Sequence, residues 1–213
     1  MNIDAVDFAS LLCSRLCHDL LSPVAALSNG LELLAQETEP DMRQQCLDLL
    51  AESCRATVNK LKFFRLAFGA AGGFGELVDS SEVREAIEGL FAANSRLTLG
   101  WMVSEPRLSK PAMKVLLNMA LIGGDALIRG GRLDIGVERR AGVIEIVIRA
   151  TGDRLVLDSA IRESLLGNPP QDALIARLGP ALLARAIAAQ HHGHIQLAET
   201  ASSHLLLGAV LRD

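Results

Sequence analysis

Three residues in one helix-forming stretch, His18, Asp19 and Pro23, have the types and the spacing that suggest chemistry. A neutral imidazole is a nucleophile near pH 7, and a neighbouring carboxylate can hold one ring nitrogen protonated so that the other attacks. Pro23 removes the helical hydrogen bond to the Asp19 carbonyl, at a cost of roughly 3 kcal/mol. We therefore take His18 and Asp19 as candidate catalytic residues. From spacing alone, His18 as a surface histidine without a role and Asp19 as a solvated charge remain alternatives.

The four cysteines and His18 raise the question of a metal site. Cys13 and Cys17 share a helix face, but His18 points about 100° away from Cys17 and no fourth ligand is evident. Without a secretion signal, disulfides are not expected. We interpret the cysteines as small buried apolar side chains: Cys13, Cys17, Cys46 and Cys54.

A second histidine cluster lies near the C-terminus, at His191, His192 and His194. Such tracts can bind zinc or nickel. The alternative is that His191 or His192 ends a helix at its negative pole, with Gly193 as the C-cap. We favour the capping interpretation and expect no metal ligands in this chain.

Composition excludes several classes of function. The 213 residues carry a formal net charge of −4, with six Phe, one Trp and no Tyr, so neither phosphate neutralisation nor base stacking is expected. The first ten residues lack the basic flank of a signal peptide, and no apolar run of about 18 residues predicts a membrane span. We expect a cytoplasmic protein that binds neither nucleic acid nor membrane.

Two long helices joined by a short turn are predicted at the start of the chain. Apolar residues recur every three or four positions up to about Gln36, and again from Met42 to Phe68, with Pro40 in the first turn of the second helix. The first apolar stripe comprises Leu12, Leu16, Leu20, Val24, Leu27, Leu31 and Leu34. Because an antiparallel hairpin cannot cover both apolar faces, we expect a homodimer that closes a four-helix bundle.

A glycine-rich segment, residues 69–75, separates this hairpin from a second unit and is predicted to be a linker. We assign residues 1–70 to a dimerisation hairpin and residues 71–213 to an α+β sandwich. Its predicted strands are 76–78, 97–103, 132–138, 143–149, 195–199 and 204–211, and its predicted helices are 79–94, 110–128, 158–166 and 171–190.

The pattern His-Asp-Leu-Leu-Ser-Pro, residues 18–23, resembles the H-box of sensor histidine kinases, in which the histidine accepts phosphate. Residues 115–127, 143–155 and 178–197 resemble that family's ATP-binding motifs, with their chemistry lost. Ile122 stands at the second asparagine, Ala150 at the adenine-binding acid, and Pro180 beside the retained Gly179. Isoleucine cannot ligate a hard cation, and proline offers no N–H to a phosphate. The resemblance thus implies a degenerate kinase-type ATP-binding domain.

Across nearly the whole chain, the sequence resembles the ChpT family of dimeric histidine phosphotransferases, most specifically in the stretch LCSRLCHDLLSPVAALSNGLELL, residues 12–34. The resemblance implies a bacterial cell-cycle phosphorelay. His18 would accept phosphate from the receiver domain of a CckA-like hybrid histidine kinase and pass it to CtrA-like and CpdR-like response regulators. It also implies that this chain needs no cofactor and that the receiver partner supplies Mg²⁺.

A receiver helix needs a surface beside His18. On the His18 face, small residues at helical spacing are expected to admit it: Ser22, Ala25, Ala26 and Asn29. If the hairpin turns near residue 38, residues of the second helix come level with His18: Val58, Asn59 and Lys62. Lys62 would screen the phosphoryl charge, or would be a solvated lysine. Two other functions stay open: an active histidine kinase core with an atypical nucleotide site, and a non-catalytic dimeric adaptor.

Overall fold

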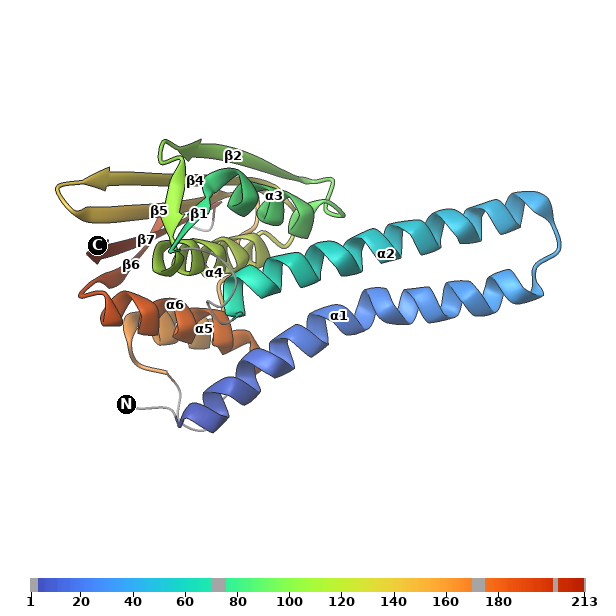
Figure 1. Cartoon of the computed structure of the whole chain (residues 1–213), viewed down its shortest axis with the longest axis horizontal. Coiled ribbons are helices and arrows are strands. Elements are labelled where there is room, and N and C mark those ends of the chain that lie inside the picture. Colours follow the sequence, from blue (N-terminus) through green and yellow to red (C-terminus); the bar gives the residue numbers. More distant parts are fainter. Residues whose placement is uncertain (1–3, 70–75, 170–174, 201–202, 213) are drawn as a thin grey trace.

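The computed structural model describes residues 4–69, 76–169, 175–200 and 203–212. A long helical hairpin projects from an α/β sandwich (Figure 1). The predicted hairpin and the predicted sandwich are both present. The glycine-rich linker proposed for residues 69–75 lies, apart from Gly69, outside the described residues. No helix of the described residues is long and apolar enough to cross a bilayer.

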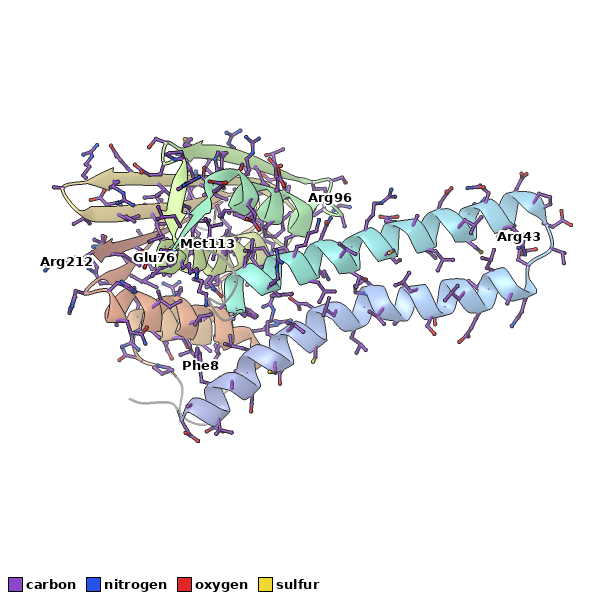
Figure 2. All side chains as sticks on the ribbon, viewed as in Figure 1. Phe8, Arg43, Glu76, Arg96, Met113 and Arg212 are labelled. Atoms are coloured by element: carbon purple, nitrogen blue, oxygen red, sulfur yellow. The ribbon has the colours of Figure 1, made fainter. Side chains whose placement is uncertain are left out.

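The hairpin consists of α1 (Ala5–Gln36) and α2 (Pro40–Phe68), which confirms the predicted end at Gln36 and the place of Pro40 in the first turn. Arg43 closes the turn at the tip of the hairpin by donating to the carbonyls of Leu34 and Glu37 at 2.9 and 2.7 Å (Figure 2). It thereby satisfies carbonyl groups that the end of α1 leaves without helical partners. Helix α1 runs without a break through Pro23 and bends midway along its length (Figure 1).

The sandwich is built on a five-stranded sheet in the order β2-β4-β5-β7-β6. Its strands are β2 (Leu97–Val103), β4 (Gly131–Arg140), β5 (Val143–Thr151), β6 (His194–Thr200) and β7 (His204–Arg212). All neighbours are antiparallel except β2 and β4, which run parallel. A short ribbon of β1 (Leu77–Asp79) and β3 (Arg107–Ser109) lies apart from this sheet, and β3 was not predicted.

Helices cover one face of the sheet (Figure 1). They are α3 (Ser80–Phe91), α4 (Lys110–Ala126), α5 (Ser159–Leu166) and α6 (Gly179–Gln190), with a 3₁₀ turn at Ala176–Leu178 before α6. Burial alternates along β5, which is typical of a strand with one face on a core and one toward solvent. The core includes Leu116, Met119, Leu133, Ile135, Ile146, Ile148 and Leu207.

The end of α2 is part of this core, so the hairpin and the sandwich share one packed region. Phe63 and Phe64 are buried and meet edge to face with centroids 5.6 Å apart. Asn118 of α4 donates to the Ala67 carbonyl at 3.3 Å, and Lys114 donates to that of Gly69 at 2.6 Å. The side chains of α4 therefore take the place of helical donors at the C-terminus of α2.

A charged cluster sits on the other face of the sheet. The Asp134 carboxylate is 2% exposed and pairs with Arg132 at 2.7 Å and with its cross-strand neighbour Arg149 at 2.7 Å. Gly100, its partner on β2, makes room for it, because a Cβ there would collide with the Asp134 carboxylate.

One expectation about burial in the hairpin was wrong, namely that all four cysteines are buried. Only Cys46 is buried, whereas Cys13, Cys17 and Cys54 are exposed, because they lie on helix faces that neither the other helix nor the sandwich covers. The predicted apolar stripe of α1 is only partly covered, with Val24 at 46% and Leu31 at 58% exposed. The positions buried on α1 are Leu11, Arg15, Pro23 and Gly30.

Candidate functional site

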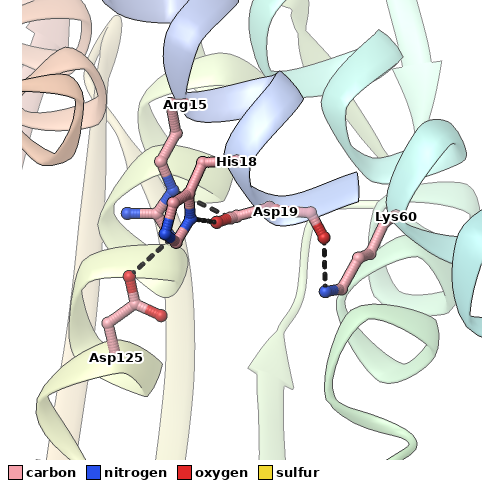
Figure 3. Close-up of polar contacts among 5 residues, drawn as sticks. All are labelled: Arg15, His18, Asp19, Lys60 and Asp125. Carbon is pink, nitrogen blue, oxygen red and sulfur yellow. Dashed lines mark hydrogen bonds and ion pairs between the residues drawn. The ribbon is translucent and has the colours of Figure 1, made fainter. Parts of the chain in front are cut away.

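His18 projects from α1 into solvent, with 75% of its side chain exposed. Its Nδ1 lies 3.0 Å from Oδ1 of Asp19 (Figure 3). A carboxylate accepts only, so Nδ1 carries the proton in the neutral ring and Nε2 presents a lone pair. The structure thus brings the two predicted catalytic residues into contact, with the ring nitrogen needed for attack left free.

A buried arginine holds Asp19 in place. Arg15, one helical turn earlier, donates from Nε to Oδ2 of Asp19 at 2.8 Å and from Nη2 to Asp125 of α4 at 2.7 Å (Figure 3). Burial lowers the pKa of Arg15, but the two carboxylates outweigh it and leave the pKa above its ordinary value. Arg15 is therefore a permanent cation that joins the His18 turn to the sandwich.

The acid at the far end of this bridge has an unusual environment. Asp125 keeps 45% of its side chain exposed, yet desolvation by the atoms packed around it raises its pKa above the ordinary value. The charge and hydrogen bond of Arg15 reverse only part of that rise.

Lys60 of α2 reaches the same turn from the opposite side. Its Nζ donates to the backbone carbonyl of Asp19 at 2.7 Å (Figure 3). Lys60, Arg15 and Asp125 were all missed in the sequence. The signals available were the carbonyl that Pro23 frees and the position of Arg15 four residues before Asp19.

An open cleft of about 660 Å³ lies beside His18, between α1 and the sandwich. Arg15, His18 and Asp19 line one side, and residues from the end of α4 and from α5 line the other, among them Ile122, Asp125 and Ile161. The surface of this cleft is therefore mixed, polar and apolar.

The residues predicted to admit a receiver are placed as follows. On α1, Ser22, Ala25 and Asn29 are exposed and Ala26 is half-buried; on α2, Val58 and Lys62 are exposed and Asn59 is half-buried. Asn59 and Lys62 line a groove of about 490 Å³ between α2 and α3. In the described chain, the α2 lysine bonded to the His18 turn is Lys60, not Lys62.

Three positions that match motifs of a kinase nucleotide site are packed against other parts of this chain. Asn118 is fully buried and turned to the end of α2. Gly179 packs under α1, where an added Cβ would lie 3.1 Å from Leu12. Gly152 packs against the carbonyl of Gly130, 2.8 Å from an added Cβ. The retained asparagine and the two glycines thus contribute to packing within this chain.

The histidine cluster ends α6, but not as expected. His191 is the C-cap, and the left-handed residue is His192, with φ of 50°, not Gly193. A glycine is needed at position 193 for a different reason, because a Cβ there would collide with the Val210 carbonyl of β7. Within the described ranges, no group of three or more His, Cys, Asp or Glu side chains gathers as metal ligands.

Comparison with known proteins gives the family. The model of the histidine phosphotransferase C-terminal domain matches residues 80–203. Protein phosphotransferase ChpT of Brucella abortus (strain 2308) is 35% identical over 176 residues, which cover 83% of this chain and 82% of the relative.

A solved structure also points to a phosphotransferase. A structure described as that of a bacterial phosphotransferase is 31% identical, with a TM-score of 0.86 and 98% of both chains covered. The blue-light activated histidine kinase domain of Erythrobacter litoralis EL346 is 4% identical with a TM-score of 0.50, covers 90% of this chain and 94% of its own, and shares the fold alone.

The fold resembles that of a histidine kinase, and the matched family and relative are phosphotransferases. The chain belongs to the histidine phosphotransferase family, of the ChpT type.

Proposed function

We propose that His18 is the phosphoacceptor of this histidine phosphotransferase and relays phosphate between aspartates of receiver domains. The observation that supports this most is the exposed ring of His18, with Nδ1 held by Asp19 and Nε2 free. An acceptor must be reachable by another protein and must present an unprotonated nitrogen, and His18 meets both needs.

The transfer follows from that geometry. Nε2 of His18 attacks the phosphorus of the receiver's aspartyl phosphate, a P–N bond forms, and the P–O bond to the receiver breaks, which returns a free carboxylate. The proton on Nδ1 stays in place, so the phosphorylated ring is a cation that the Asp19 carboxylate stabilises. The reverse sequence delivers phosphate to a second receiver. Mg²⁺ belongs to the receiver in both steps.

We further propose that the chain works as a homodimer with a four-helix bundle. Several large apolar side chains of the hairpin are at least 40% exposed in the single chain: Leu21, Val24, Leu31, Leu33, Met42, Leu47, Leu49 and Leu61. So much apolar surface on two neighbouring helices supports a partner hairpin. In this proposal residues 1–70 dimerise and carry the phosphate, and residues 71–213 add recognition surface.

The partners are proposed from the family resemblance. The donor is the receiver domain of a CckA-like hybrid histidine kinase, and the acceptors are CtrA-like and CpdR-like response regulators of a cell-cycle phosphorelay. The receiver docks along the His18 face of α1, on Ser22, Ala25, Ala26 and Asn29, with Val58, Asn59 and Lys62 of α2 contributing. The small side chains there support close approach of a receiver helix.

We also propose that the chain does not take phosphate from ATP. The packed environments of Asn118, Gly152 and Gly179 support this, because all three residues contact other parts of the chain. An active kinase core is the competing function, and tight equilibrium binding of labelled ATP with Mg²⁺ would favour it.

The test is transfer from a radiolabelled phosphorylated receiver to the purified protein. We expect acid-labile label on the wild type and on His191→Gln, a control that removes a histidine at the end of α6, and none on His18→Ala. Equal labelling of His18→Ala would contradict the proposal. If His18→Ala leaves signalling intact in cells, the protein is a non-catalytic adaptor.

A further inference from the structure

The turn of α1 that carries His18 has a backbone defect. In a helix, the N–H of residue 23 would donate to the carbonyl of Asp19, but Pro23 has no N–H. Pro23 is buried, and α1 continues on both sides of it. The Asp19 carbonyl therefore needs a donor from elsewhere.

Lys60 is that donor. It lies 41 residues away in sequence, on the facing helix, and its half-buried side chain places Nζ 2.7 Å from the carbonyl oxygen. A bond from a charged donor is stronger than the neutral helical bond that it replaces. Asp19 is thus fixed at its backbone by Lys60 and at its carboxylate by Arg15 (Figure 3).

This fixation bears on His18, because adjacent residues of a regular helix point apart. The 3.0 Å contact between Nδ1 of His18 and Oδ1 of Asp19 needs a particular position of the Asp19 backbone. An ordinary residue at position 23 would satisfy the carbonyl within α1 alone. The proline and lysine together place that turn relative to α2 instead.

We propose that Lys60 is a positioning residue for phosphotransfer: it replaces the donor that Pro23 removes and holds Asp19 where it orients the His18 ring. The inference rests on the proposed function of His18. Lys60 acts through Asp19, whose backbone carbonyl accepts from its Nζ.

The first test is the rate of phosphotransfer in a single turnover, from a receiver domain labelled with radioactive acetyl phosphate. Lys60→Met keeps the length of the side chain but cannot donate, and we expect the rate to fall about tenfold or more. Lys60→Arg restores a charged donor and should recover most of the rate. Arg84→Met, which removes a cation from α3, should match the wild type. Thermal unfolding and dimer mass are measured for each variant.

A double-mutant cycle with Pro23→Ala separates positioning from general loss of charge. An alanine at position 23 has an N–H that can donate to the Asp19 carbonyl, so Lys60→Met should have an effect of about twofold or less in that background. If Lys60→Met slows transfer equally with proline and with alanine at position 23, the inference is wrong.

The tautomer of His18 gives a second readout, which lost stability alone would not move. Nitrogen chemical shifts of the ring should show the Nδ1–H form in the wild type and a larger Nε2–H fraction in Lys60→Met. Unchanged shifts would overturn the inference. If instead the wild type takes no label from any phosphorylated receiver, the proposed function fails, and that result is separate from the behaviour of Lys60.

Discussion

At the scale of residues, the site is a chain of contacts from the free nitrogen of His18 to the sandwich. Asp19 accepts from His18 and from Arg15, and Arg15 reaches Asp125. The carboxylate is only 16% exposed while the imidazole is 75% exposed. The acid is therefore sheltered and oriented, and the histidine is presented to a partner.

Asp19→Asn keeps the shape of that contact and removes its charge. We expect phosphotransfer to slow by about 100-fold, because the amide cannot stabilise the cationic phosphorylated ring. The measurement is the single-turnover rate from a phosphorylated receiver. Asp48→Asn, on an exposed part of α2 far along the hairpin, is the matched control and should leave the rate unchanged. A wild-type rate in Asp19→Asn would remove Asp19 from the mechanism.

Sequence reasoning found His18 and Asp19 but missed Arg15, whose signal is local, and the residues that depend on tertiary structure. His18 and Asp19 belong to one recognisable run, residues 18–23. Lys60 and Asp125 reach that run only through folding, across 41 and 110 residues counted from Asp19 and Arg15. The freed carbonyl of Asp19 could be deduced from Pro23, but its donor could not.

At the scale of elements, the hairpin was predictable and the short ribbon was not. Apolar periodicity over some thirty residues and a proline at a helix start indicated the bounds of α1 and α2. Strand β3 has three residues, too few for any alternation to stand out. The left-handed His192 was missed for a different reason, since Gly193 is required by contact with β7 and not by its own backbone.

The exposed apolar side chains of the hairpin make dimerisation testable. Leu31 and Leu47 lie at comparable distances from the turn and are 58% and 47% exposed. Changing both to Glu should convert a dimer to a monomer, because four charges in one bundle core cannot be solvated. Light scattering after size exclusion measures the mass. Glu32→Gln, beside Leu31, should remain dimeric. A wild type with the mass of one chain would refute the bundle.

The sheet offers a prediction about pH. Desolvation tends to raise the pKa of Asp134, but hydrogen bonds and charges from Arg149 and Arg132 outweigh it and hold the pKa below its ordinary value. A carboxylate with a lowered folded pKa contributes stability above the unfolded pKa, and loses it as pH falls through the folded one.

Asp134→Asn should therefore lower the free energy of unfolding at pH 7 by about 1–2 kcal/mol, a modest figure because both arginines stay more than half exposed. Urea denaturation at pH 7 and near pH 3 measures it. The difference in free energy of unfolding between the variant and the wild type should be smaller at pH 3 than at pH 7. An equal gap at both values would show that the cluster does not titrate as described.

At the scale of the whole molecule, the sandwich has the architecture of a kinase ATP-binding domain. Two positions that match the kinase motifs contact the helical hairpin in this chain. Asn118 binds the end of α2, and Gly179 packs under the start of α1 beside Leu11 and Leu12. Asp125 then pairs with Arg15 next to the proposed phosphoacceptor. In this chain, the region of the sandwich around Gly179 and Asp125 therefore packs against α1 and holds it in place.

Asp125→Asn tests whether that ion pair fastens α1 to the sandwich. Loss of the charge should speed hydrogen exchange of α1 amides between residues 8 and 16, by roughly tenfold, while the tip of the hairpin is unchanged. Asp153→Asn, in an exposed loop of the sandwich, serves as the control. Identical exchange rates in Asp125→Asn and the wild type would show that apolar packing at Leu11 holds α1 on the sandwich without the ion pair.

The most direct measurement of the central claim is the position of the phosphoryl group after transfer. Phosphorus NMR combined with mass spectrometry of the labelled protein identifies both the residue and the ring nitrogen. The account predicts phosphate on Nε2 of His18, because Asp19 holds Nδ1. Phosphate on Nδ1 of His18, or on any other residue, would contradict it.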